Sequence, residues 1–193
     1  MTKFILHGGY TRENNESNKS FFQEFLKDVP ENGEVLLVYF ASETEEAKRI
    51  SSETHIERCQ ENSQGKKLNI TIATKENFLD EIKRAHAILF NGGRTKILME
   101  ALKEYPDIRS FVQGKTVAGS SAGAYTLASF GSAHSEERVK EGLGLVPVRV
   151  ICHYESLKQP PTPKSVELLR NTRQDLELVI LRDYEWKVFD QFV

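Results

Sequence analysis

The chain has 193 residues, of which 39% are hydrophobic and 28% charged, and its formal net charge is −2. Such values are ordinary for a folded protein and predict a single domain over residues 1–193. The small net charge gives no basis for binding nucleic acid or an anionic membrane. The two cysteines have no metal-like spacing, and no apolar run is long enough to span a membrane. We therefore expect a cytoplasmic protein, monomeric or homodimeric, without a metal or cofactor.

Short apolar runs rich in Val, Ile and Leu alternate with helical patterns along the chain. Near-continuous runs of this kind are typical of parallel strands covered on both faces. The alternation predicts an α/β fold, a three-layer α/β/α sandwich around a mostly parallel, doubly wound sheet. The expected strands cover residues 3–6, 35–40, 69–73, 87–90, 116–118, 146–152 and 176–181.

Several segments between these strands carry helix signals. Ser42 and Glu45 have the spacing of a capping box, which would open a polar helix that ends near residue 62. Thr162 and Pro163 are suited to the N-cap and the first position of a helix over residues 164–173. The polar segment 131–144 is expected to be a mobile loop. Ligands of such folds bind at the carboxyl ends of the strands.

The most informative stretch is 116–124, which contains Gly-x-Ser-x-Gly centred on Ser121. It lies between a predicted strand and a predicted helix over 124–130, which is the setting of a nucleophile elbow. Gly119 and Gly123 allow the tight turn that this motif needs. The turn would present the Ser121 hydroxyl near backbone N–H groups that can stabilise an oxyanion. The alternative is a small-residue turn without chemistry.

A serine nucleophile needs a base, and the chain has five histidines. His153 and His7 each end a predicted strand at the carboxyl edge of the sheet. We rank His153 first, because its strand follows that of the nucleophile, and His7 second. Of the remaining three, His55 is expected to be solvated on a polar helix, His86 to lie at the amino edge, and His134 to lie in the mobile loop.

A carboxylate commonly orients such a histidine. Asp183 and Glu185 both follow the last predicted strand, again at a carboxyl end. The implied order of serine, histidine and acid differs from that of most α/β-hydrolases, so a different scaffold is expected. Cys152 is a weaker candidate nucleophile, because in a strand it would point away from the side of its neighbour His153.

A second glycine-rich segment, 91–95, follows a predicted strand and opens a helix. Gly92 and Gly93 would let the backbone approach a substrate closely. An N–H group there, at Gly93, could form an oxyanion hole with that of Ala122. The alternative is phosphate binding, but the segment has neither the dinucleotide-binding glycine pattern nor a P-loop lysine.

Four segments, in this order along nearly the whole chain, resemble peptidase family S51, which includes the aspartyl dipeptidase peptidase E and cyanophycinase. They are Gly-Gly-Arg-Thr at 92–95, Ser-Ala-Gly-Ala at 121–124, Val-Ile-Cys-His-Tyr at 150–154 and Leu-Arg-Asp-Tyr-Glu-Trp at 181–186. The resemblance implies a class I glutamine amidotransferase-like, flavodoxin-like fold with serine at the elbow in place of cysteine. It also implies a triad of Ser121, His153 and Asp183.

The activity implied by the resemblance is that of a serine-type peptidase cleaving a peptide-like amide in a small peptide, with Asp-X dipeptides as candidate substrates. The residues placed at the substrate are Gly92, Arg94, Ser120 and Tyr154. Asp183 stands where the family usually has glutamate, so Glu185 is the alternative acid. Two other functions stay open: a non-catalytic protein that binds a small ligand or regulates, and an esterase.

Overall fold

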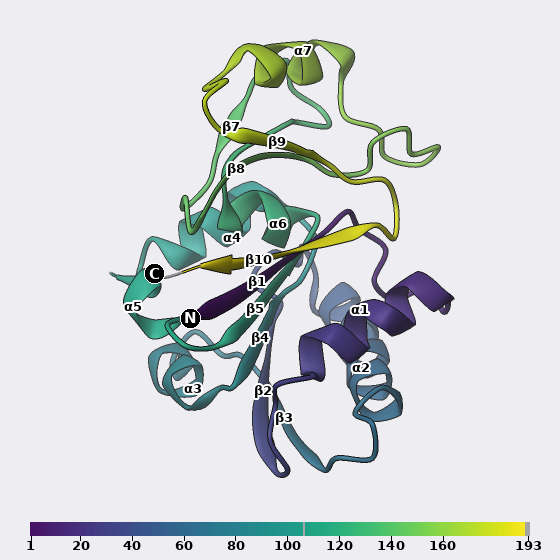
Figure 1. Cartoon of the computed structure of the whole chain (residues 1–193), viewed down its shortest axis with the longest axis vertical. Coiled ribbons are helices and arrows are strands. Elements are labelled where there is room, and N and C mark those ends of the chain that lie inside the picture. Colours follow the sequence, from purple (N-terminus) through teal and green to yellow (C-terminus); the bar gives the residue numbers. More distant parts are fainter. Residues whose placement is uncertain (106, 192–193) are drawn as a thin grey trace.

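The computed structural model describes residues 1–105 and 107–191, and its larger part is built on a six-stranded sheet (Figure 1). The strand order is β10-β1-β5-β4-β2-β3. All neighbours are parallel except β10, which is antiparallel to β1. The strands are β1 (Thr2–His7), β2 (Gly33–Val38), β3 (Leu68–Ile72), β4 (Ala87–Phe90), β5 (Thr116–Ser120) and β10 (Trp186–Gln191).

Helices cover both faces of this sheet, which confirms the predicted sandwich (Figure 1). One face carries α1 (Glu16–Leu26) and α2 (Glu45–Glu61). The other carries α3 (Phe78–Arg84), α4 (Thr95–Leu102), α5 (Ile108–Phe111) and α6 (Ala122–Leu127). The parallel strands lie close to the predicted ranges, because a strand covered on both faces must be apolar almost throughout.

A second sheet of four strands has the order β7-β6-β8-β9. Its strands are β6 (Ala128–Gly131), β7 (Lys140–Glu141), β8 (Val146–Ile151) and β9 (Glu177–Ile180). The strands expected over 146–152 and 176–181 therefore belong to this sheet and not to the central one. The reason lies in α6, which ends at Leu127 and passes directly into β6. A return to the central sheet as a parallel strand would need a longer crossover.

Two sequence predictions in this region are corrected. A helix was expected over 124–130, but α6 ends at Leu127. Residues 128–130 belong instead to β6. The loop expected over 131–144 contains β7, and it begins with the fully buried Ser132 and Ala133. Ser132 is hydrogen-bonded to Val150 and Tyr125, and the Ala133 carbonyl accepts from Thr162 and Ser165. The polar composition of the segment does not reveal these long-range contacts.

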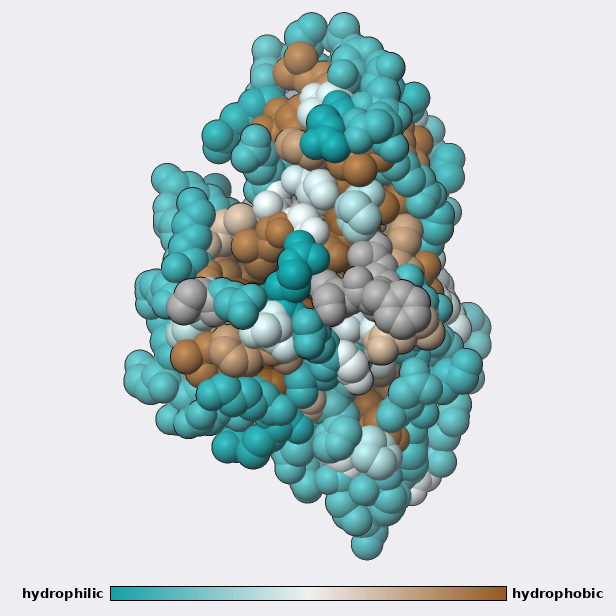
Figure 2. All heavy atoms as spheres, turned by 60° about the vertical axis from the view of Figure 1, so that its left-hand side comes forward, coloured by the Kyte–Doolittle hydropathy of each residue, from teal (hydrophilic) through white to brown (hydrophobic). Residues whose placement is uncertain are grey.

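The surface is mostly hydrophilic in the view of Figure 2, and apolar side chains show in patches through its middle band. Among residues 1–105 and 107–190, few large apolar side chains are exposed, and Leu157, at 101% exposure, is the most exposed of them. Among the described residues, no helix combines the length and apolar composition needed to cross a bilayer.

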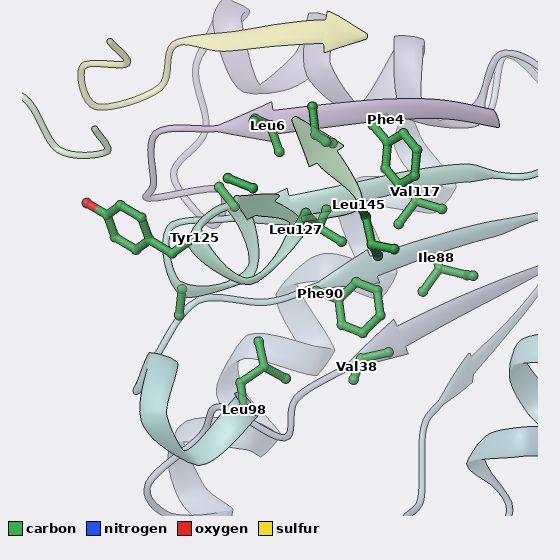
Figure 3. Packing of buried hydrophobic residues seen from close by; sticks show 14 of the residues in the cluster. Phe4, Leu6, Val38, Ile88, Phe90, Leu98, Val117, Tyr125, Leu127 and Leu145 are labelled. Atoms are coloured by element: carbon green, nitrogen blue, oxygen red, sulfur yellow. The ribbon is translucent and has the colours of Figure 1, made fainter. Parts of the chain in front are cut away.

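The buried side chains alternate between the two faces of the central sheet. Phe4 and Leu6 pack against the α4 and α6 side, whereas Ile5 between them packs against α1. This alternation follows from the two-residue period of a strand. Val148 and Val150 of the second sheet belong to the same apolar cluster as Phe4. One continuous core therefore joins the two sheets around α6 (Figure 3).

Two helix starts test the capping predictions. Thr162 caps α7 (Pro163–Asn171), accepting a hydrogen bond from the Ser165 N–H at 3.2 Å, as predicted. The predicted capping box at Ser42 is wrong, because α2 is capped by Thr44, which accepts from the Ala47 N–H at 3.1 Å. Ser42 instead donates its backbone N–H to Tyr39 in the preceding turn.

Candidate active site

Ser121 occupies the turn between β5 and α6, with φ 50° and ψ −104°. A positive φ is strained for a residue with a side chain. The strand and helix can pack this closely because of two glycines. A Cβ on Gly119 would lie 2.5 Å from the Gly123 backbone, and one on Gly123 would lie 2.1 Å from the Phe90 carbonyl oxygen. The strand–turn–helix geometry predicted for the elbow is therefore confirmed.

The hydroxyl of Ser121 is the first member of a hydrogen-bonded chain of three side chains. It lies 3.0 Å from Nε2 of His153, and Nδ1 of His153 lies 2.7 Å from a carboxylate oxygen of Asp183. Because Asp183 accepts the Nδ1–H, Nε2 is free to accept from the serine. Ser121 follows β5, His153 follows β8 and Asp183 follows β9. The site thus lies where the carboxyl ends of strands from both sheets meet.

The imidazole of His153 is held by the loop that follows β1. His153 has φ 54°, another strained backbone, and its N–H donates to the Gly8 carbonyl at 3.2 Å. A Cβ on Gly9 would lie 2.0 Å from the ring, so the backbone of Gly9 packs directly against the imidazole. The ring of Tyr10 meets the imidazole edge to face, with centroids 4.8 Å apart. These contacts leave His153 2% exposed.

His7, the second candidate base, does not face Ser121. It is fully buried, and its Nδ1 accepts the Gly9 N–H at 3.0 Å. Its Nε2–H then donates to the side-chain oxygen of Asn18 at 2.9 Å. Burial lowers the pKa of His7 to about 4, so the ring is neutral at pH 7. Both ring nitrogens are occupied in fixing the loop under His153.

The prediction for His55 is wrong, and that for His86 is confirmed. His55 is fully buried, with Nδ1 2.9 Å from the Tyr39 hydroxyl and Nε2 3.0 Å from that of Thr11. The polar sequence of α2 does not predict this burial, because the partners of His55 lie outside the helix. His86 is exposed at the amino edge of the sheet, where Nδ1 accepts the Glu34 N–H at 3.0 Å.

His134 is a neighbour of the site that no sequence signal identified. Its ring centroid lies 5.5 Å from that of His153, and its Nε2 lies 3.1 Å from the Tyr125 hydroxyl. Burial, together with the charge on His153, lowers the pKa of His134 to about 4. A neutral ring at this position can pack beside His153 without repelling its protonated form.

The two candidate acids occupy different positions. Asp183 contacts His153, whereas a carboxylate oxygen of Glu185 accepts the Arg182 N–H at 2.8 Å. The other carboxylate oxygen of Glu185 lies 3.8 Å from the Arg182 guanidinium. Of the two, Asp183 therefore has the geometry of the third member, and Glu185 shapes the turn that carries it.

The glycine-rich segment after β4 runs beside the elbow. A Cβ on Gly92 would lie 3.5 Å from Cβ of Ser121. Gly93 has φ 140°, and a Cβ there would lie 2.3 Å from the Ala41 carbonyl oxygen, which also accepts the Arg94 N–H at 2.8 Å. The segment is thus fixed between the loop after β2 and the candidate nucleophile.

The remaining residues placed at a substrate lie in different surroundings. Arg94 is exposed and paired with Glu43 on the surface. Ser120 is 2% exposed within β5. Tyr154 is half-buried, and the Arg182 guanidinium lies over its ring, 5.9 Å from the centroid. The structure therefore brings Gly92 to the elbow and leaves Arg94 with another charged partner.

Cys152 is buried close to the elbow but is a poor nucleophile. Its Sγ lies 4.0 Å from the Ser121 carbonyl oxygen, and burial raises the pKa of the thiol well above its usual range. A thiol in this state is not converted to the reactive thiolate. Within residues 1–105 and 107–191, no group of three His, Cys, Asp or Glu side chains could hold a metal ion.

Known proteins share a sequence family and a fold with this chain. The model of peptidase family S51 matches residues 4–190. The fold is similar to that of a peptidase from an acI-B1 Actinobacterium, with a TM-score of 0.77 and 20% identity over 98% of this chain and 83% of that one. It is also similar to a peptidase E protein from Listeria monocytogenes EGD-e, with a TM-score of 0.65 and 16% identity over 100% and 99% of the two chains. A comparison with the curated proteins gives no match. The chain belongs to peptidase family S51 and is a serine-type peptidase.

Proposed function

We propose that the protein hydrolyses peptide-like amide bonds in small peptides through an acyl-enzyme on Ser121. The observation that carries the proposal is the continuous chain of hydrogen bonds from Ser121 through His153 to Asp183, with spacings of 3.0 and 2.7 Å. The spacings suit proton transfer from the nucleophile to the base and orientation of the base by the acid.

In the proposed first half-reaction, Ser121 Oγ forms a bond to the carbonyl carbon while its proton moves to Nε2 of His153. The imidazolium then gives this proton to the leaving amine as the C–N bond breaks, which leaves an ester on Ser121. In the second half-reaction, a water oxygen forms a bond to the ester carbonyl carbon while His153 takes the water's proton. The bond between that carbon and Ser121 Oγ then breaks, His153 returns the proton to Ser121 Oγ, and the peptide's new carboxyl group is released. The Asp183 carboxylate stabilises the imidazolium in both halves.

The negative charge on the carbonyl oxygen requires hydrogen-bond donors. We assign these to the backbone N–H groups of Ala122 and Gly93. Ala122 directly follows Ser121 as the first residue of α6, so its N–H has no partner one turn earlier in the helix. Support for Gly93 comes from its neighbour Gly92, which lies against the Ser121 side chain.

The proposed substrate is a small peptide. We also propose that the enzyme prefers an acidic residue directly before the scissile bond. Arg94 follows the Gly92 and Gly93 segment and could pair with a substrate carboxylate through two hydrogen bonds. Arg94 forms an ion pair with Glu43. The acidic preference therefore requires a substrate carboxylate to replace Glu43 as the ion-pair partner of Arg94.

The proposal is tested by measuring hydrolysis of a dipeptide panel and a panel of simple esters by the wild-type protein and Ser121→Ala. Loss of peptide cleavage in the variant supports the proposal. Ser129→Ala, a half-buried serine on β6, is the matched control and should keep wild-type rates. Cleavage of esters without peptides would indicate an esterase, and no cleavage of either panel would favour a ligand-binding protein.

A further inference from the structure

Tyr125 connects the helix that follows Ser121 to the end of the strand that precedes His153. It lies one turn after Ser121 on α6, and its N–H donates to the Ser121 carbonyl at 3.0 Å. The side chain is 2% exposed, and its hydroxyl reaches the residue that directly follows β8. Figure 3 shows this hydroxyl turned away from the apolar side chains of the core.

The Tyr125 hydroxyl contacts both backbone polar groups of Cys152, the residue directly before His153. It accepts the Cys152 N–H at 3.0 Å and lies 3.3 Å from the Cys152 carbonyl oxygen, to which it can donate. Burial raises the pKa of Tyr125 well above its usual value, so the phenol keeps the proton that this donation needs.

This contact lies where the backbone is strained. His153 has φ 54°, and a side-chain-bearing residue keeps such a conformation only when its surroundings over-determine it. On the following side, the His153 carbonyl accepts the Ser156 N–H at 3.0 Å. On the preceding side, the Tyr125 hydroxyl holds Cys152. The strained residue is therefore fixed from both directions.

The surroundings of the Tyr125 ring fit it closely. A Cβ on Gly131 would lie 2.2 Å from the ring, so the glycine makes room for it. Ser132 Oγ and His134 Nε2 each lie 3.1 Å from the hydroxyl. The buried hydroxyl is thus surrounded by hydrogen-bond partners, and Tyr125→Phe would remove all of these contacts together.

We propose that Tyr125 is a positioning residue of the active site, which sets the distance between Ser121 Oγ and His153 Nε2 by holding the backbone at Cys152. The inference rests on the proposed function, since it assigns a role in the Ser121 reaction. Tyr125 itself does not contact the reacting atoms. Its loss should therefore slow the chemical step and leave binding of a small reagent almost unchanged.

The test uses Tyr125→Phe, which keeps the ring and removes the hydroxyl. The matched control is Tyr39→Phe, because Tyr39 is also a buried tyrosine whose hydroxyl meets a histidine, His55, at 2.9 Å. Tyr39 packs in the other apolar cluster, on the α1 and α2 side of the sheet. Both variants lose one buried hydroxyl, so a purely structural role predicts similar effects for the two.

The measurement is the rate of covalent labelling by a fluorophosphonate, resolved into the maximal labelling rate and the half-saturating reagent concentration, with thermal unfolding recorded in parallel. Tyr125→Phe should lower the maximal rate by about 10- to 100-fold, since displacement of a catalytic group by ~1 Å has effects of this size. The half-saturating concentration should change by less than about two-fold. Tyr39→Phe should lower the melting temperature comparably and keep the wild-type labelling rate.

Gly131→Ala is a second test variant. Its added methyl group must displace the Tyr125 ring, although the tyrosine hydroxyl is kept. It should lower the maximal rate in the same way. Wild-type labelling at Ser121 together with undiminished rates in folded Tyr125→Phe or Gly131→Ala would overturn the inference and leave the proposed function standing. Equal rate losses in Tyr125→Phe and Tyr39→Phe would also overturn it. Failure of the wild type to label at Ser121 would instead contradict the proposed function.

Discussion

The carboxylate of Asp183 accepts a hydrogen bond from His153 at 2.7 Å, whereas Glu185 binds the backbone of Arg182. Asp183→Asn should lower kcat/KM on a cleaved peptide by about 100-fold or more, because an amide can donate to Nδ1 and so favour the wrong tautomer. Glu185→Gln should stay within about three-fold of wild type. Both variants are compared by steady-state kinetics. An inactive Glu185→Gln beside a normal Asp183→Asn would reassign the acid.

The pair of Arg94 and Glu43 gives a second prediction at the scale of residues. If Arg94 reads a substrate carboxylate, Glu43→Gln should raise kcat/KM for Asp-Leu by about two- to ten-fold, since the variant removes the competing carboxylate. Arg94→Ala should abolish any preference for Asp-Leu over Asn-Leu and Ala-Leu. The ratios of kcat/KM for the three dipeptides check both variants. Ratios that neither variant changes would exclude this role of Arg94.

Strand ends in the sequence narrowed the candidate bases to His153 and His7 and the candidate acids to Asp183 and Glu185. The resemblance to family S51 then implied the set of Ser121, His153 and Asp183. Ser121 has in addition a motif with local spacing. Tyr125 and His134 could not be selected in this way. Their positions depend on hydrogen bonds and ring contacts between residues distant in the fold, such as that from Tyr125 to Cys152, and no spacing encodes these. The burial of His55 was not predicted for the same reason, because its partners Tyr39 and Thr11 lie in distant segments of the chain.

At the scale of elements, the link between β8 and α7 depends on one buried arginine. Arg149 is 6% exposed, and its guanidinium donates to four backbone carbonyls at and after the end of α7: Leu169, Arg170, Thr172 and Leu176. These carbonyls include groups that a helix leaves without partners, and a cation is favourable at this end of the helix dipole.

Arg149→Met should therefore reduce the free energy of unfolding by about 2–4 kcal/mol, since it leaves buried carbonyls without donors. The matched control is Arg170→Met, which removes an exposed arginine from the last turn of the same helix, and should change stability by less than about 0.5 kcal/mol. Urea denaturation, with the midpoint and slope of each transition, provides the comparison. Equal losses in the two variants would rule out the proposed role of Arg149.

The helices and strands differ in how clearly their sequences predict them. β4 lies at residues 87–90, as predicted, and all four of its side chains are buried. β10 was missed because it is an antiparallel edge strand in which exposed Lys187 and Asp190 interrupt the apolar residues. The second sheet was missed because its separation depends on where α6 ends. Composition does not determine such an end when strand and helix are made of similar small residues.

At the scale of the whole molecule, buried histidines make stability depend on pH. Burial lowers the pKa of His55 to about 3 and that of His7 to about 4, from a usual value of 6.5. The unfolded chain therefore binds more protons than the native state as pH falls below about 6.5. The stability of the fold is present at neutral pH and is lost toward pH 4, at up to ~1.4 kcal/mol per pH unit for each histidine.

His55→Gln should flatten this dependence between pH 6 and 4.5 by about one proton equivalent, whatever its stability at pH 7. His86→Gln, which removes an exposed histidine, is the matched control. Urea denaturation across this pH range gives the unfolding free energies. An unchanged slope in His55→Gln would mean that His55 is not the buried neutral group described above.

The central claim is that Ser121 is the nucleophile of a hydrolytic site assembled by the ends of two sheets. The most direct measurement is peptide mapping by mass spectrometry after reaction with a fluorophosphonate near pH 7.5. The account predicts one covalent adduct, located on Ser121 and absent from Ser121→Ala and from His153→Ala, while folded Ser129→Ala is labelled like the wild type. An adduct on another residue, or equal labelling of wild type and His153→Ala, would contradict it.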